Sequence, residues 1–199
     1  MIPANCILVA CPHCRNEKEL FSAASGNTFG AQLWSDAKFE APMLPECSPI
    51  QKCNSCGHYY LLSEAKYKKG NDISFETGWL SFEEAVEAYK ELNGTNNGHL
   101  ELLTTIVIWA YNDLLRCGKS PVREQYEIFK VIVSNYLKDP IVLVNELLRG
   151  ELYREIEEYE ECITFSNKYK SKNAFEDAVK MQIIRKAEEH IKDVFVIKQ

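Results

Sequence analysis

The chain has 199 residues, of which 46% are hydrophobic and 26% charged, a composition typical of globular proteins. Its formal net charge is −6, with 7 basic against 8 acidic residues up to residue 78 and 16 against 21 beyond it. Nucleic-acid-binding proteins usually carry a basic surplus that neutralises phosphates, so this balance counts against a nucleic acid as the main partner. No segment approaches the roughly 20 apolar residues that cross a bilayer, so we expect no membrane association.

The start of the chain is apolar but short, and no basic residue precedes the apolar stretch, which does not fit a secretory signal. Leu8-Val9-Ala10-Cys11 has the form of a lipoprotein cleavage box, but only ten residues stand before the cysteine. We therefore expect a cytoplasmic protein. In a reducing compartment its 8 cysteines indicate metal or redox chemistry rather than a disulfide framework.

Four of these cysteines form two Cys-x-x-Cys pairs, Cys11 with Cys14 and Cys53 with Cys56. Two intervening residues let each pair fold back so that both sulfurs reach one ion, and Gly57 suits the positive φ of such a turn. Four thiolates in tetrahedral geometry suit zinc and leave no position open for a substrate. The sequence therefore predicts one structural zinc ion, and we expect it to stabilise the fold rather than to catalyse a reaction.

Two other interpretations of the cysteines remain open. Cys-Pro-His-Cys after an apolar strand also matches the active site of thioredoxin-like oxidoreductases, although the alternating strands and helices of that fold do not follow it here. Alternatively, Cys47, His13 or His58 could replace one of the four ligands. We expect Cys6 and Cys47 to be small buried residues, and His13 to face solvent.

The 38 residues between the two pairs are more than the 15–20 typical of a zinc ribbon, so the insert must carry structure of its own. Strand-like segments flank the pairs at 6–10 and 58–62. Within the insert, 29–34 and 38–43 read as two strands joined by a turn at 35–37. We expect a small antiparallel zinc-ribbon-like β domain over residues 1–78.

From residue 81 the apolar pattern changes to a helical period, which predicts an all-α domain over 79–199 and an α+β protein overall. Ser81 and Glu84 form a capping box, and Asn93-Gly94 ends that first helix. The further helices are expected at about 99–117, 121–137, 140 to between 153 and 156, 158–169 and, after the cap Asn173, up to about Val194.

One stretch of this helical region, from Val144 to Lys170, resembles a tetratricopeptide repeat. Leu148, Gly150 and Tyr153 have the first-helix spacing, and Cys162 stands where a small residue is usual. No second copy is evident. We therefore expect a single repeat-like hairpin within the helical domain.

As a whole, the chain resembles a family of uncharacterised bacterial proteins that combine split Cys-x-x-Cys knuckles with a repeat-like helical tail. The insert segments Ser25-Gly26-Asn27-Thr28-Phe29-Gly30-Ala31 and Leu33-Trp34-Ser35-Asp36-Ala37-Lys38 carry the most specific likeness. Where that family usually has glycine after the first knuckle, this chain has Arg15. The resemblance implies the two-part architecture and assigns no activity.

Trp109, Asn112, Asp113 and Arg116 share one side of the second predicted helix and form a possible recognition patch. A core tryptophan with a local Asp113–Arg116 pair is the simpler interpretation. An acidic cluster is expected to be a solvated face. It consists of Glu155, Glu157, Glu158, Glu160 and Glu161.

Three functions follow as hypotheses. The closed metal site and the helical array favour a non-enzymatic interaction module that binds a protein or peptide. A nucleic-acid-associated zinc-ribbon regulator is the alternative, and it rests on the basic-aromatic run Lys66-Tyr67-Lys68-Lys69. An enzyme of unrecognised class would have to use Asp113, Arg116 or Asp36, and no catalytic motif supports one.

Overall fold

A computed structural model describes residues 1–94, 99–139 and 146–198 of the chain. The chain divides into two compact units. Unit 1 comprises Met1–Ala31 and Glu40–Ile106, and unit 2 comprises Gln32–Phe39 and Val107–Gln199. The middle of the insert is thus grouped with the helices, and the first helix is grouped with the strands. The independent domains 1–78 and 79–199 expected from the sequence remain a prediction.

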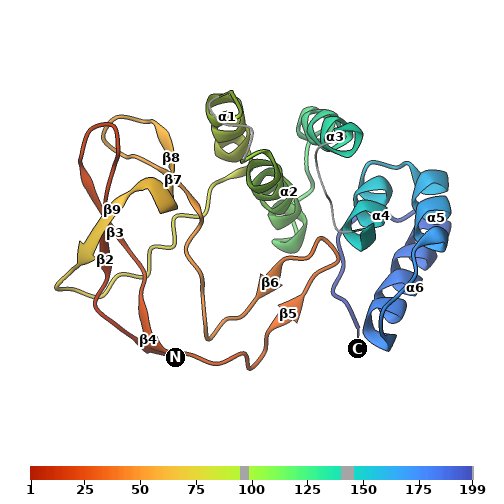
Figure 1. The fold of residues 1–199 in the computed structure, drawn as a ribbon, viewed down its shortest axis with the longest axis horizontal. Helices are drawn as coiled ribbons and strands as arrows, with labels where there is room; N and C mark the ends of the chain where they lie inside the picture. Colours follow the sequence, from red (N-terminus) through yellow and green to blue (C-terminus); the bar gives the residue numbers. More distant parts are fainter. Residues whose placement is uncertain (95–98, 140–145, 199) are drawn as a thin grey trace. The chain divides into compact units, whose positions relative to one another are not determined.

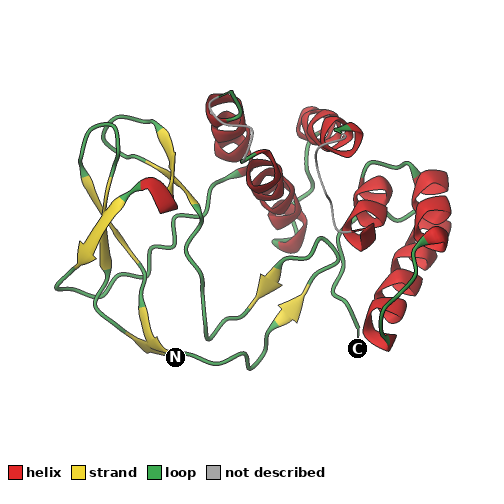
Figure 2. Ribbon diagram, viewed as in Figure 1, coloured by secondary structure: helices red, strands yellow, loops and turns green. Residues whose placement is uncertain are grey.

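Short strands occupy the N-terminal half and helices the C-terminal half, which confirms a mixed α+β class (Figure 1, Figure 2). The strands are β1 (Ile2–Pro3), β2 (Ile7–Ala10), β3 (Glu17–Leu20), β4 (Ala23–Ser25), β5 (Gln32–Leu33), β6 (Phe39–Glu40), β7 (Ile50–Lys52), β8 (Tyr59–Leu61) and β9 (Lys66–Lys69). The helices are α1 (Phe82–Leu92), α2 (Leu100–Arg116), α3 (Arg123–Lys138), α4 (Glu146–Glu155), α5 (Tyr159–Lys168) and α6 (Ala174–Glu188). No helix in the described part of the chain is long and apolar enough to cross a membrane.

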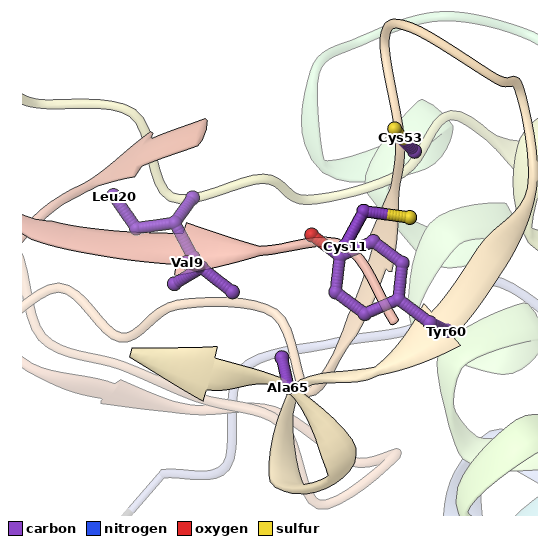
Figure 3. Packing of buried hydrophobic residues seen from close by; sticks show 6 residues of the cluster. All are labelled: Val9, Cys11, Leu20, Cys53, Tyr60 and Ala65. Atoms are coloured by element: carbon purple, nitrogen blue, oxygen red, sulfur yellow. The ribbon is translucent and has the colours of Figure 1, made fainter. Parts of the chain in front are cut away.

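The strands of unit 1 form several small sheets rather than the one sheet expected. β2 pairs antiparallel with β3 on one side and β9 on the other, and β7 pairs antiparallel with β8. Val9, Leu20 and Tyr60 pack beside two of the cysteines in the core between these strands (Figure 3). Because the sheets are so small, this core buries few side chains, and the cysteines are part of it.

Helix α1 begins and ends where the sequence predicts. The Ser81 side chain accepts a hydrogen bond from the Glu84 backbone N–H, and the Glu84 carboxylate accepts one from the Ser81 N–H, which completes the capping box. The helix runs to Leu92, and Asn93 is its C-terminal cap.

The insert forms a hairpin in unit 2. β5 pairs with β6, and the Trp34 N–H donates to the Lys38 carbonyl at 2.9 Å across the turn. On its other side, the hairpin is hydrogen-bonded to residues 195–197 near the C-terminus. The Ser35 N–H donates to the Phe195 carbonyl, and the Ile197 N–H donates to the Leu33 carbonyl. The predicted turn at 35–37 is therefore present, between strands that are shorter than expected.

Two helix boundaries predicted from the sequence are wrong. Helix α6 follows its cap Asn173 as expected but ends at Glu188 rather than near Val194. His190 adopts a left-handed φ of 53°, and the chain beyond it becomes extended because it pairs with the hairpin. Helix α3 begins at Arg123 rather than at Pro121. The expected start of the fourth helix lies within 140–145, outside the described residues.

Helices α4, α5 and α6 pack against one another in unit 2. Gly150 of α4 lies so close to α5 that an added Cβ would stand 2.5 Å from the Ser166 Oγ. Cys162 of α5 is fully buried in the same region. Small residues thus let two helices approach, as the repeat-like pattern requires, but the tetratricopeptide likeness itself remains a prediction.

Candidate metal centre

The four paired cysteines lie in two similar turns of unit 1. Cys11 follows β2 and Cys14 precedes β3, whereas Cys53 follows β7 and Cys56 precedes β8. In each turn the first cysteine's carbonyl accepts a backbone hydrogen bond at 2.9 Å from the residue four positions later. Both pairs therefore form the same knuckle at the end of a two-stranded hairpin.

The residue after each knuckle takes a left-handed backbone conformation. Gly57 has a φ of 79° and Arg15, at the equivalent position, a φ of 64°. Glycine adopts this region freely, whereas a side chain with a Cβ disfavours it. The arginine thus keeps the geometry of the knuckle at a cost in conformational energy.

The two knuckles bring all four sulfurs together. The Sγ atoms of Cys11, Cys14, Cys53 and Cys56 lie within 4.8 Å of one another. Across the knuckles, Cys11 lies 3.8 Å from Cys56 and Cys14 lies 3.5 Å from Cys53. Metal–sulfur bonds of about 2.3 Å in a tetrahedron place sulfurs about 3.8 Å apart, whereas a disulfide needs about 2.05 Å. The geometry therefore fits one metal ion, and all four cysteines are free thiols rather than members of a disulfide.

Within the described ranges, this is the only group of three or more potential metal ligands whose ligating atoms lie together. Cys47 is not among them, because its thiol donates to the Phe21 carbonyl at 3.5 Å. Cys6 is fully buried, as expected of a small core residue. Nor do the first two cysteines begin a helix, as a thioredoxin-like active site would require, because Cys14 leads into a strand.

Without a cation, the four neighbouring thiols cannot all ionise, because each thiolate repels the next. Burial opposes ionisation of Cys53, but N–H donors from Cys56 and Ser55 outweigh it and lower the pKa to about 6. A His58 N–H favours the thiolate of Cys56, yet burial and the neighbouring thiols raise its pKa to about 12. A cation at the centre removes this competition and allows all four thiolates to form.

The cluster lies partly in the core and partly at the surface. Cys11 is 2% exposed and Cys53 is 4% exposed, whereas Cys14 and Cys56 are exposed. Tyr60 packs against the buried pair, and burial, with added repulsion from the thiols, raises its pKa to about 12 (Figure 3).

Two exposed histidines next to the knuckle cysteines stack on each other and are not members of the ligand group. The rings of His13 and His58 stack with centroids 4.7 Å apart, one from each knuckle region. The Nδ1 of His58 lies 2.8 Å from a Glu91 carboxylate oxygen, and the Tyr59 hydroxyl donates to Glu87 at 2.7 Å. Because Glu87 and Glu91 share one face of α1, this helix anchors the second knuckle.

The possible recognition patch lies in unit 2, where three of its members bind Asp36. The Trp109 indole N–H donates to the Asp36 carbonyl at 3.1 Å, and the Asn112 amide donates to its carboxylate at 2.9 Å. The Arg116 guanidinium forms an ion pair with the same carboxylate and another, at 2.7 Å, with Asp113. Asp36 is 2% exposed and Asn112 is 1% exposed. These contacts give the patch a packing role, and a recognition role remains a prediction.

Sequence reasoning missed the rest of this buried network. Glu155 is 3% exposed, so the expectation that it belongs to a solvated acidic face is wrong. Its carboxylate oxygens accept the Asn112 amide at 3.2 and 3.1 Å, one turn from a buried Arg154–Glu151 ion pair. Arg154 also donates to the Ile191 carbonyl, just before the C-terminal segment whose Val196 bridges to Trp34 of the hairpin.

Unit 2 also contains a pocket of about 720 Å³ beside the hairpin. Its wall mixes apolar and polar side chains in similar measure and comes from α4, the 169–173 segment, α6, the hairpin and the C-terminal segment. Its apolar lining includes Leu33, Leu147, Phe175, Val179, Ile183 and Ile197. Glu146, Lys172 and Glu176 supply charges around it. Polar groups beside apolar side chains are typical of sites that bind small ligands or peptide side chains.

The basic-aromatic run of the nucleic-acid hypothesis forms β9, an edge strand of unit 1. All four of its residues are exposed, and Tyr67 is 74% exposed. Lys68, however, forms an ion pair with Glu17 at 2.8 Å, which reduces the local positive charge.

Together these features define a two-unit α+β protein with a four-cysteine cluster that could hold a metal ion. Comparison of the chain with models of protein families, with curated proteins and with solved structures finds no match.

Proposed function

We propose that the four cysteines bind one structural zinc ion and that the chain is a non-enzymatic module that binds a protein or peptide segment through the pocket of unit 2. The metal and the pocket belong to different units, so the zinc stabilises a scaffold and takes no part in binding. The pocket beside the hairpin is the observation that carries the binding proposal.

The choice of zinc follows from the ligand set. Thiolate ligands favour a soft or borderline-soft metal ion. Zinc is such an ion, and it accepts tetrahedral coordination because its filled d shell imposes no other geometry. Because all four positions are filled by protein, no position remains for a water or a substrate. The strands around the cysteines form only small sheets, and the buried cluster beside the metal site is small, so metal binding adds stability to this part of unit 1.

A short apolar segment of a partner, with a basic residue beside it, fits the pocket best. The wall offers aliphatic side chains and Phe175, which is 42% exposed and available for contact. Around the wall, two carboxylates, Glu146 and Glu176, outnumber the one cation, Lys172. An apolar anchor with a nearby positive charge therefore matches both the surface and the charge of the pocket.

Selection of peptides from a random library on the purified, zinc-loaded chain tests this proposal. We expect selected peptides to be apolar with a basic neighbour, and Phe175→Ala to weaken their binding at least tenfold in fluorescence anisotropy. Met181→Ala is the matched control, since Met181 is 56% exposed on the same helix and does not line the pocket. Peptides that bind Phe175→Ala as tightly as the wild type would refute the assignment of this pocket.

A further inference from the structure

The buried network around Asp36 contains one carboxylate more than its cations can pair. Within the described part of unit 2 its cations are Lys38, Arg116 and Arg154, and its carboxylates are Asp36, Asp113, Glu151 and Glu155. Lys38 and Arg116 both pair with Asp113, and Arg116 also pairs with Asp36. Four carboxylates thus face three cations, and three of the carboxylates, Asp36, Glu151 and Glu155, are buried, whereas Asp113 is partly exposed.

Glu155 is the unpaired member of this set. Arg154 directs two nitrogens of its guanidinium at Glu151, and no cation described in unit 2 forms an ion pair with Glu155. Among the residues that the structure describes, the Asn112 amide donates the hydrogen bonds to the Glu155 carboxylate, and it also donates to Asp36. A buried carboxylate in this position is stable only when it is neutral, because an unpaired charge costs far more than a hydrogen-bonded carboxylic acid.

We propose that Glu155 retains a proton in the folded protein and that this single proton locks the 32–39 hairpin onto the helices of unit 2. Asn112 links the protonated group to Asp36 at the tip of the hairpin turn. Ionisation of Glu155 places a second buried negative charge beside Asp36, and the hairpin separates from α2 and α4 so that both groups reach water.

The charged and titratable groups around Glu155 agree with this assignment. Burial raises the pKa of Glu155 well above its usual value, and Glu151 and Asp36 raise it further against the opposing effect of Arg154. Burial also raises the pKa of Asp36, which has Arg116 to counter it. Other groups that influence the same region are Tyr111, Glu157 and Asp193.

The raised pKa of Glu155 determines how the stability of the closed hairpin changes with pH. With the hairpin open, Glu155 titrates near its ordinary pKa of about 4.3, whereas in the closed state it stays protonated to higher pH. Closing therefore takes up a proton, so the lock is fully formed below the open-state pKa and weakens as pH rises toward the closed-state pKa. The equilibrium between the open and closed states should shift toward the open state up to tenfold for each pH unit in that range.

The lock also affects the pocket, because Trp34, Ser35 and Ala37 of the same hairpin line it. Control of ligand binding by this proton would rest on the proposed function. The lock itself is independent of any ligand, and its test reads the hairpin alone.

Hydrogen exchange at the hairpin provides that test. The Ser35 N–H donates to the Phe195 carbonyl and the Ile197 N–H donates to the Leu33 carbonyl, so these two amides join the hairpin to the C-terminal segment, and their protection reports the release of the hairpin. After correction for intrinsic exchange, we expect the wild-type protection of these two amides to fall up to tenfold per pH unit between the open-state and closed-state pKa values of Glu155. Glu155→Gln, which cannot ionise, should give a flat profile, and Glu161→Gln, on the exposed side of α5, should keep the wild-type slope.

A flat wild-type profile, or a wild-type slope in Glu155→Gln, would overturn the proposal. Carbon-13 NMR of the Glu155 carboxyl carbon in the wild-type chain gives a second readout that does not depend on a variant folding. We expect the midpoint of its titration to lie well above the ordinary pKa of a glutamate. A midpoint at or below the ordinary value would overturn the proposal equally.

Discussion

At the left-handed position that follows the second cysteine, the first knuckle has Arg15 and the second has Gly57. Substitutions at these two positions should change metal affinity in opposite directions. Gly57 occupies the left-handed region at a φ of 79°. For a residue with a Cβ, this backbone conformation costs about 1–2 kcal/mol of conformational energy. No other atom lies within 4 Å of a Cβ placed on Gly57, so steric contact adds nothing. Against this cost, replacing glycine stabilises by about 0.4–1 kcal/mol through the unfolded chain.

The net effect of Gly57→Ala is therefore a loss of about 0.5–1 kcal/mol, or about two- to fivefold in zinc affinity, because metal binding and knuckle folding are coupled. Arg15→Gly should raise the affinity by a similar factor, since Arg15 holds a φ of 64°. Competition with a chromophoric chelator at fixed pH measures both. Gly94→Ala is the control, because Gly94 has no left-handed φ and no described atom lies within 4 Å of a Cβ placed on it. Unchanged affinity in Gly57→Ala, or weaker binding in Arg15→Gly, would refute the strain argument.

The remaining predictions concern unit 2. Asp36→Ala removes the buried partner of Arg116 and leaves it only the partly exposed Asp113, so we expect a loss of about 3 kcal/mol in chemical denaturation. Asp113→Ala should cost about 1 kcal/mol or less, since its side chain is 34% exposed, and equal losses in the two variants would contradict the network. Gly150→Ala should destabilise by about 1–2 kcal/mol, because its Cβ would lie 2.5 Å from the Ser166 Oγ. Ser166→Ala should restore most of this in the double variant, and purely additive losses would show that the two helices are not in close contact there.

The features predicted correctly from the sequence depend on neighbouring residues. Two cysteines separated by two residues already define a knuckle, and the hydrogen bonds that hold it lie within its own turn. The same is true of the capping box of α1, whose donor and acceptor are three residues apart. The sequence pattern does not show that the two knuckles meet. We inferred it from metal chemistry, because one zinc ion needs four ligands and the two pairs together supply four.

The features missed depend on contacts distant in sequence. The partners of Asp36 stand 76 and 80 residues away, at Asn112 and Arg116, so no local pattern could reveal its burial. Glu155 was assigned to the surface because four other glutamates follow it, and only the packing of α4 turns it inward. The end of α6 was placed too late because its helical period continues past the point where pairing with the hairpin takes over.

Metal content is the most direct test of the zinc site. Mass spectrometry of the purified chain in its native state should find one zinc ion per chain, and Cys53→Ser should lose the ion together with stability of unit 1. Cys117→Ser, at an exposed cysteine of unit 2, should keep both. A wild-type chain that binds no zinc after reduction and reconstitution, or that joins Cys11 to Cys14 in a disulfide under reducing conditions, would contradict the assignment.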